Sequence, residues 1–321
     1  MTEIVPEALR DARIRTEFVE ANGLRFEVDK CGTGDRLALC LHGFPEHSFS
    51  WRYQLPVLAE LGYQAWAPNL RGYGHSSRPE GVAAYALEHL LEDVAQLIDA
   101  SGARETVLLA HDWGAVIAWY FAMRRCRPLT HLVICNVPHP QAMQQGFSLE
   151  QLKRSWYVFF FQVPGLAEHF LGRRQGEAMR NIMRASAVDK HRFPDEVGEV
   201  YWRNAMQPGA LTAMVNYYRA LVRGGGARRQ KLQGFPVIET PTLMVWGEED
   251  VALTKETTYG TDRYVRSLTL RYLPRVSHWV QQEQPEAVNA MIAAFLEERP
   301  VPQFGWRSEL MDADAEDAND R

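Results

Sequence analysis

The fold is decided by the stretch Leu108-Leu109-Ala110-His111-Asp112-Trp113-Gly114-Ala115. The apolar run before Asp112 predicts a buried parallel strand, and the apolar run at 116–123 predicts a helix directly after it. This is the layout of a nucleophile elbow, a tight strand-to-helix turn that raises one side chain above a sheet and needs small flanking residues such as Gly114. Most elbows raise a Ser. With Asp112 in its place, the motif predicts that a carboxylate attacks carbon.

Asp112 also has a purely structural interpretation. An Asp at the start of a helix often serves as its N-cap, where the carboxylate accepts a hydrogen bond from a free backbone N–H. A short motif alone does not separate a nucleophile from a cap, so the choice depends on the rest of the chain.

The composition is that of a globular chain with a large core. Its 321 residues are 46% hydrophobic, which is enough for one large domain with an insertion or for two domains. The formal net charge of −5 gives no reason to expect binding to nucleic acid or to an anionic membrane surface. No apolar segment approaches the ~20 residues that cross a bilayer, and the acidic N-terminal stretch is unlike a signal peptide.

Cysteine usage and motif content argue against a metal or a cofactor. The chain has no CxxC, HExxH or glycine-rich phosphate loop, so we predict no metal site and no nucleotide cofactor. The four cysteines show no close pairing, which predicts reduced thiols in a cytoplasmic protein. They are Cys31, Cys40, Cys126 and Cys135.

Strand-like and helix-like segments alternate through the first part of the chain. Segments 15–20 and 24–29 alternate apolar and polar residues around Asn22-Gly23, which predicts an antiparallel hairpin at a sheet edge. The alternation that follows predicts a mainly parallel, doubly wound sheet of the α/β class. The strands are expected at 36–41, 63–68, 106–110 and 129–135, and the helices at 54–61, 87–98 and 116–123.

The alternation stops at about residue 138, and the patterns then indicate helices only. We predict an α/β core formed by residues 1–137 and 235–300, interrupted by an all-helical cap at 138–234. Residues 301–321 are acidic and poor in large apolar side chains, which predicts a disordered tail. Core patterns resume at 242–246, 268–273 and 285–298.

Two segments of the resumed core resemble loops of the α/β-hydrolase fold family. Trp246-Gly247-Glu248-Glu249-Asp250 is similar to the family's acid loop, which assigns the acid to Asp250. Pro274-Arg275-Val276-Ser277-His278-Trp279 is similar to its catalytic histidine loop. The order nucleophile, helical insertion, acid, histidine is that of the family. The resemblance implies the α/β-hydrolase fold, with Asp112, Asp250 and His278 as a catalytic triad.

His42-Gly43-Phe44-Pro45-Glu46 resembles the oxyanion loop of the same family. By this resemblance, the main-chain N–H groups of Phe44 and Trp113 hold the oxyanion that forms during ester hydrolysis. His42 and Glu46 are expected to hold the loop in place and take no part in the chemistry. Phe44 and Trp113 are also expected to contact the substrate, in a pocket that they line with aromatic residues of the cap.

Two segments of the predicted cap resemble the tyrosine segments of epoxide hydrolases. They are Ser155-Trp156-Tyr157-Val158-Phe159-Phe160-Phe161-Gln162-Val163-Pro164-Gly165 and Asn216-Tyr217-Tyr218-Arg219. The match implies that Tyr157 and Tyr218 donate to the epoxide oxygen, because a phenol with a pKa of about 10 stays protonated at neutral pH. Tyr217 competes with Tyr218, since neighbours on a helix point about 100° apart and only one should face the site. For the three phenylalanines of the first segment, core packing is the better interpretation.

The resemblance implies an epoxide hydrolase. Asp112 opens an apolar or aryl epoxide to form a covalent ester, and His278 with Asp250 activates water to release a vicinal diol. Water is the only co-substrate, and the protein is expected to be a monomer or a homodimer.

Two other functions remain as alternatives. A haloalkane or haloacid dehalogenase uses the same triad, and halide release without a diol would identify it. Haloalkane dehalogenases usually have Asn where Phe44 stands, and fluoroacetate-type enzymes usually have Arg where Trp113 stands, so both positions favour the epoxide hydrolase. The second alternative is a small-molecule binding protein that keeps the fold without turnover.

Overall fold

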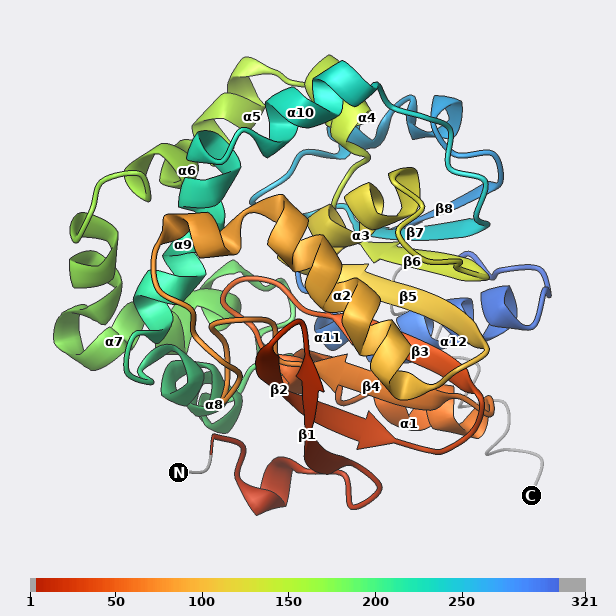
Figure 1. Ribbon diagram of the computed structural model, residues 1–321, viewed down its shortest axis with the longest axis horizontal. Helices are drawn as coiled ribbons and strands as arrows, with labels where there is room; N and C mark the ends of the chain where they lie inside the picture. The colour runs from red at the N-terminus through yellow and green to blue at the C-terminus, as the bar shows by residue number, and fades with distance from the viewer. Residues whose placement is uncertain (1–3, 306–321) are drawn as a thin grey trace.

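The computed structural model describes residues 4–305 and has an eight-stranded sheet at its centre (Figure 1). The strand order is β1-β2-β4-β3-β5-β6-β7-β8; the pairs β1–β2 and β2–β4 are antiparallel and every later pair is parallel. The predicted mainly parallel, doubly wound sheet is therefore confirmed. The strands are β1 (Arg15–Ala21), β2 (Leu24–Cys31), β3 (Arg36–Leu41), β4 (Gln64–Pro68), β5 (Glu105–His111), β6 (His131–Cys135), β7 (Thr242–Gly247) and β8 (Leu268–Leu273).

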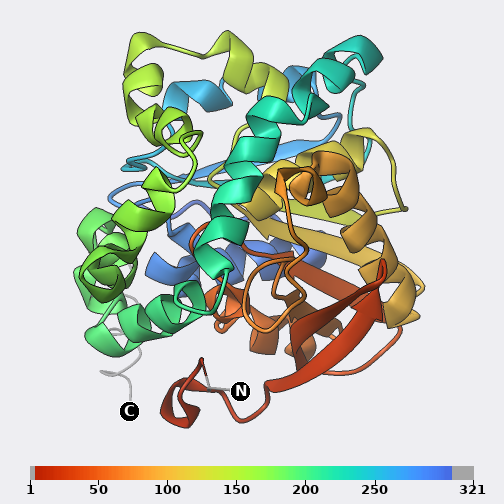
Figure 2. The same cartoon turned by 60° about the vertical axis from the view of Figure 1, so that its left-hand side comes forward.

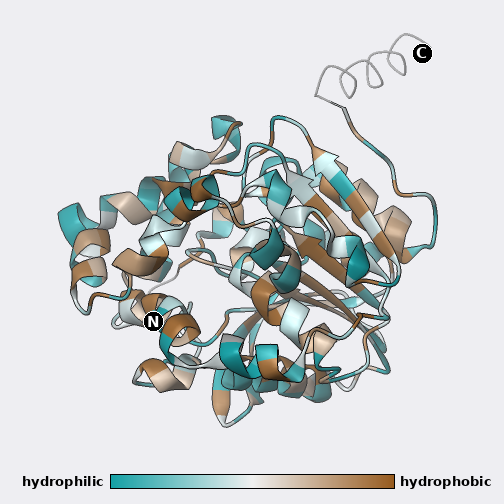
Figure 3. Ribbon diagram, turned by 90° about the horizontal axis from the view of Figure 1, so that it is seen from above, coloured by the Kyte–Doolittle hydropathy of each residue, from teal (hydrophilic) through white to brown (hydrophobic). Residues whose placement is uncertain are grey.

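Helices cover both faces of this sheet, and β3 contributes to the packing on each. Its alternating side chains Leu37, Leu39 and Leu41 pack with α2 and α3, whereas Ala38 and Cys40 pack in a second core with α1 and α12. Figure 3 shows hydrophobic residues concentrated on the strands between these helices. The helices are α1 (Gln54–Glu60), α2 (Leu87–Ser101), α3 (Trp113–Met123), α11 (Val280–Glu283) and α12 (Pro285–Leu296).

Between β6 and β7, residues 136–241 of the described chain form helices and no strand. Figure 2 brings these helices, green to teal, to the front. α7 is interrupted at 173–176, where Arg174, Gln175 and Gly176 have positive φ angles. The helices are α4 (Pro140–Gln145), α5 (Leu149–Arg154), α6 (Trp156–Phe160), α7 (Leu166–Ser186), α8 (Asp195–Ala205), α9 (Ala210–Arg223) and α10 (Gly226–Gln233). The domain boundaries at 138 and 234 stay a prediction.

The end of the described chain lies against the sheet. The Arg271 guanidinium on β8 donates to the carbonyl oxygens of Val301 and Pro302. The rest of the predicted tail, 306–321, lies outside the described residues.

Three features of the described residues bear on the expected properties of the chain. All four cysteines lie in the described part and are free thiols. Within residues 4–305, no helix is long and apolar enough to cross a bilayer. The same residues include no cluster of three His, Cys, Asp or Glu side chains that could hold a metal.

Candidate active site

Asp112 stands in the tight turn that joins β5 to α3. Its backbone angles, φ 48° and ψ −120°, lie where residues other than glycine are rare. The carboxylate makes no capping hydrogen bond to α3; its Oδ1 accepts instead from the N–H of Phe44 at 2.6 Å. The geometry thus excludes the helix-cap interpretation and turns the carboxylate away from its own helix.

Two glycines leave the space that this turn requires. A Cβ on Gly114 would stand 2.3 Å from the carbonyl oxygen of Leu41, and a Cβ on Gly43 would stand 2.2 Å from Asp112 Oδ1. Both distances are far below van der Waals contact, so any larger residue would displace the turn or the carboxylate. The need for a small residue at position 114, inferred from the sequence, has this steric cause.

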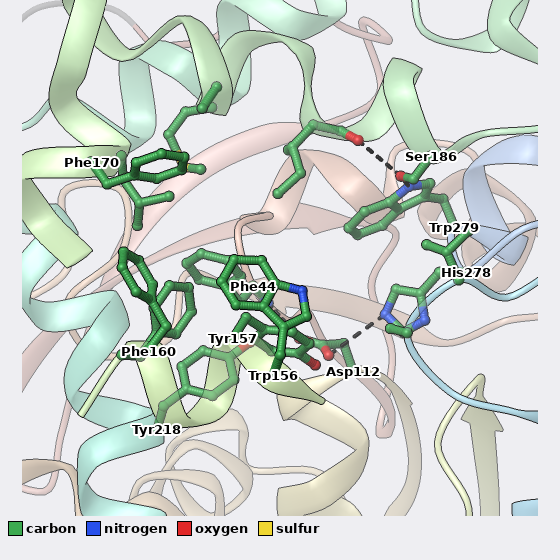
Figure 4. Close-up of a pocket in the computed structure, with 17 residues that line it drawn as sticks. Phe44, Asp112, Trp156, Tyr157, Phe160, Phe170, Ser186, Tyr218, His278 and Trp279 are labelled. Carbon is green, nitrogen blue, oxygen red and sulfur yellow. Dashed lines mark hydrogen bonds and ion pairs between the residues drawn. The ribbon is translucent and has the colours of Figure 1, made fainter. Parts of the chain in front are cut away.

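The His278 imidazole lies between the carboxylates of Asp112 and Asp250. Its Nδ1 is 2.6 Å from Asp250 Oδ2. Its Nε2 is 3.6 Å from Asp112 Oδ2, the ion pair that Figure 4 shows. The other oxygen of Asp250 accepts from the backbone N–H groups of Ala252 and Leu253 at 2.7 and 2.9 Å. The structure therefore brings together the three residues predicted as a triad, although they come from three separate loops.

The charges of the triad shift the pKa of His278 and that of Asp112. Burial alone would lower the pKa of His278, but the Asp250 charge and the contacts with both carboxylates raise it to about 10. Burial alone would raise the pKa of Asp112, but His278, the nearby His111 and the Phe44 N–H hold it below its ordinary value. At neutral pH, Asp112 is thus an ionised carboxylate beside a protonated His278.

A cavity of about 300 Å³ lies above Asp112 and His278. Tyr157 and Tyr218 both line it, with ring centroids 5.7 Å apart. Tyr217 does not: it is fully buried, and its hydroxyl donates to the carbonyl oxygen of Arg71 at 2.9 Å. The other lining residues are Phe44, Trp156, Phe160, Phe161, Phe170, Leu171, Ala178, Met179, Ile182, Ser186, Val251, Ala252 and Trp279.

Comparison with known proteins assigns the chain to a family. The model of the alpha/beta hydrolase fold family matches residues 39–285. "Epoxide hydrolase 2" of Caenorhabditis elegans is 35% identical over 309 residues, which are 93% of this chain and 85% of that protein. The chain belongs to the epoxide hydrolases of the α/β-hydrolase fold family.

Other epoxide hydrolases agree with this assignment. "Epoxide hydrolase 3" of Xenopus tropicalis is 37% identical over 288 residues, covering 86% of this chain and 76% of that protein. The crystal structure of an inhibitor-bound Bacillus megaterium epoxide hydrolase superposes with a TM-score of 0.80 at 30% identity. That match covers 88% of this chain and 100% of the Bacillus megaterium chain.

The cavity of this epoxide hydrolase corrects two expectations. The Trp113 side chain, expected to line it, is not among the lining residues; its ring packs edge-on against those of Tyr217 and Tyr218. Core packing was expected for Phe159, Phe160 and Phe161. Phe161 is buried in the hydrophobic core and Phe160 packs against it, and both also line the cavity, but Phe159 is 62% exposed. Periodicity says which side chains share a helix face, and the side of this segment that carries Phe159 meets solvent.

Sequence reasoning missed Asn136, which supports the acid of the triad. This buried residue follows β6, and its Nδ2 donates to Asp250 Oδ2 at 2.7 Å. Its Oδ1 accepts from the N–H of Gly247 at 3.0 Å, so both ends of the amide are fixed. The available signal was a polar residue at the carboxyl end of a parallel strand, where sites of α/β proteins gather.

A buried ion pair ties the elbow to two other loops. The His111 Nδ1 is 2.7 Å from Glu46 Oε2, and its Nε2 is 2.8 Å from the carbonyl oxygen of His278. The carboxylate and the carbonyl oxygen hold the His111 ring at both of its nitrogens. Glu46 also accepts from the side chains of Gln281 and Gln282. These contacts fit the loop-holding role expected for Glu46.

His42 lies in the same loop as Glu46 and is fully buried. Its Nε2 accepts from the N–H of Leu70 at 3.0 Å, and its Nδ1 lies 2.9 Å from the carbonyl oxygen of Gly43. An accepting Nε2 and a donating Nδ1 describe a neutral ring. Both ring nitrogens are thus engaged with backbone, which fits the holding role expected for His42.

Proposed function

We propose that this epoxide hydrolase converts an apolar or aryl epoxide to a vicinal diol through a covalent ester on Asp112. One observation supports this above all: an ionised carboxylate and two phenols face the same largely apolar cavity. They are the nucleophile and the acids that opening of an epoxide requires. A halide leaves as a weakly basic ion that takes no proton, so the two phenols favour the epoxide over the dehalogenase alternative.

In the first step, an oxygen of Asp112 bonds to a ring carbon and the carbon–oxygen bond of the epoxide breaks. The electron pair stays on the epoxide oxygen, which takes a proton from Tyr157 or Tyr218. Burial, together with the charge of Asp112, raises the pKa of both phenols. Both therefore stay protonated at neutral pH and can donate to the developing alkoxide.

Ester formation prepares the second step. It removes the negative charge of Asp112. In the free enzyme, that charge helps to raise the pKa of His278. The pKa of His278 then falls, and the proton that it releases can return to the phenol. The neutral imidazole is now a base, held by Asp250 in the tautomer that presents Nε2 to water.

Hydrolysis returns the enzyme to its starting state. His278 takes a proton from water, and the hydroxide adds to the carboxyl carbon of Asp112. The N–H groups of Phe44 and Trp113 hold the oxyanion, as the 2.6 Å bond from Phe44 to Asp112 Oδ1 suggests. The bond between the carboxyl carbon and the alkyl oxygen then breaks, and the leaving diol takes the proton from His278. The Asp112 carboxylic acid that remains gives its own proton to His278.

The two phenols are tested by Tyr157→Phe and Tyr218→Phe. We expect each change to slow ring opening roughly 10- to 100-fold, and the double variant to be nearly inactive, because general acids contribute about 10²–10⁴-fold. Single-turnover kinetics with styrene oxide measure the step directly. The matched control is Tyr217→Phe, which removes a hydroxyl outside the cavity. A double variant that opens styrene oxide at the wild-type rate would refute the acid assignment.

Asn136→Ala tests how the acid of the triad is held. Loss of the amide that donates to Asp250 should slow ester hydrolysis roughly tenfold, since hydrogen bonds to charged groups contribute about 1.5–3 kcal/mol. Attack by Asp112 should keep its rate, because the side-chain hydrogen bonds of Asn136 go to Asp250 and Gly247 and not to Asp112. Rapid mixing separates the two steps. Equal slowing of both would mean general structural damage instead of a defect at Asp250.

A further inference from the structure

A row of large apolar side chains faces solvent along α5, α6 and the start of α7. They follow one another at steps of three or four residues, on two short helices, on the turn 161–165 and on the first turns of α7. Large apolar patches on a protein surface mark contacts with other proteins or with membranes. We call this row the apolar stripe. It consists of Leu149 (79% exposed), Leu152 (40%), Trp156 (58%), Phe159 (62%), Val163 (46%), Leu166 (46%) and Phe170 (47%).

The apolar stripe borders the mouth of the catalytic cavity. Trp156 and Phe170 belong to the stripe and also line the cavity, so the cavity reaches the surface beside them. The Phe160 ring connects them, with its centroid 5.7 Å from each of the other two. Figure 4 shows Phe160 and Phe170 on one side of the cavity, across from His278.

Basic side chains flank the apolar stripe. Between Leu149 and Phe170, the two carboxylates Glu150 and Glu168 are paired with Arg154 and Arg219, and Lys153 is exposed. Arg173 and Arg174 line an open groove of about 460 Å³ that begins at Phe170, and Arg174 pairs there with Glu177. Exposed Trp, Phe and Leu side chains flanked by Lys and Arg are typical of surfaces that lie in the headgroup region of a membrane.

We propose that the apolar stripe docks the protein on an anionic phospholipid surface, with the cavity mouth turned to the acyl chains. Lys153 and Arg173 then contact lipid phosphates, and the apolar stripe enters the boundary between the headgroups and the acyl chains. The net charge of the chain argued against such a surface, but the charge beside the stripe is positive. An apolar epoxide dissolved in the bilayer could reach Asp112 without crossing water; this route rests on the proposed function, whereas the docking does not.

A second copy of the chain is the other possible occupant of the stripe. A two-fold interface brings the same patch of both copies together. Lys153 of one copy would then approach the same row of the other, where the acidic side chains Glu150 and Glu168 already pair with Arg154 and Arg219. The charge pattern therefore favours lipid over self-association.

Sedimentation with vesicles tests the docking. The full chain is mixed with vesicles of phosphatidylcholine, or of phosphatidylcholine with about a third phosphatidylglycerol. We expect the wild type to bind the anionic vesicles. The double variant Leu149→Ser/Phe159→Ser should bind them roughly 10- to 100-fold more weakly, since two large apolar side chains lose their burial. Neither residue lines the cavity, so turnover of dissolved styrene oxide should be unchanged.

Two further variants separate the apolar and the charged contributions. Phe18→Ser/Leu232→Ser is the matched control, because it removes one Phe and one Leu that are 41% and 81% exposed elsewhere. It should bind like the wild type. Lys153→Gln/Arg173→Gln should weaken binding to the anionic vesicles, and added salt should do the same to the wild type.

Three outcomes would overturn the docking. The first is a wild type that sediments with neither vesicle. The second is an equal loss of binding in the stripe variant and its matched control. The third is a wild-type dimer, seen by analytical ultracentrifugation, that the stripe variant dissociates, which would mean that a second copy covers the stripe. Sedimentation needs no catalysis, so a protein that binds vesicles but opens no epoxide would refute the proposed function alone.

Discussion

Asp112→Ala should abolish epoxide turnover, with a loss of at least about 10⁴-fold, as is typical when a catalytic nucleophile is removed. No other carboxylate lines the catalytic cavity in the described part of the chain, so no second carboxylate can take over the attack. Steady-state assays measure the loss, and mass spectrometry of the protein after exposure to styrene oxide should find no adduct. Asp262→Ala, at an exposed carboxylate, is the matched control and should keep full activity.

The same variant has a readout that does not depend on activity. Asp112 helps to raise the pKa of His278 to about 10, so its removal should lower that pKa. Titration of the imidazole by nuclear magnetic resonance should detect the change, and the proton should leave at lower pH than in the wild type. Retained turnover, or an unchanged His278 titration, would contradict the assignment of Asp112 and its coupling to His278.

His278→Gln should separate the two chemical steps. Asp112 can still open the epoxide, but no base remains to activate water, so the ester should accumulate. We expect turnover to fall by roughly 10³-fold or more. Intact-protein mass spectrometry should find one substrate mass added, and peptide mapping should assign it to Asp112.

His169→Gln, at an exposed histidine in α7, is a control that should hydrolyse its ester normally. A His278→Gln protein that is slow but carries no adduct would mean that His278 acts before the ester forms. The two-step scheme would then be wrong in its order.

The central strands could be predicted closely because they are buried on both faces. β3 (Arg36–Leu41) is such a strand, an apolar run that matches its predicted bounds at both ends. β8 (Leu268–Leu273) also matches, although it is a half-buried edge strand in which apolar and polar residues alternate. The triad could be predicted for a related reason. Asp112, Asp250 and His278 each follow a strand, and the carboxyl ends of parallel strands meet at one edge of the sheet.

Other features depend on contacts that a single sequence does not reveal. The helical pattern does not say whether Tyr217 or Tyr218 faces the site. In the structure Tyr218 lines the cavity, whereas the Tyr217 hydroxyl donates to the carbonyl oxygen of Arg71. Asn136 has no motif around it, because its role comes from Asp250, more than a hundred residues away. Phe159 was assigned to the core because periodicity says which side chains share a face, but not what that face meets.

The most direct test of the covalent ester is a single turnover of styrene oxide in ¹⁸O-labelled water. Enzyme is kept in excess, and diol and protein are analysed by mass spectrometry. The ester mechanism predicts that the oxygen added to the first diol comes unlabelled from Asp112, and that the label appears in the Asp112 carboxylate. A first diol that carries the solvent label, with Asp112 unlabelled, would mean direct attack by water and would contradict the covalent ester.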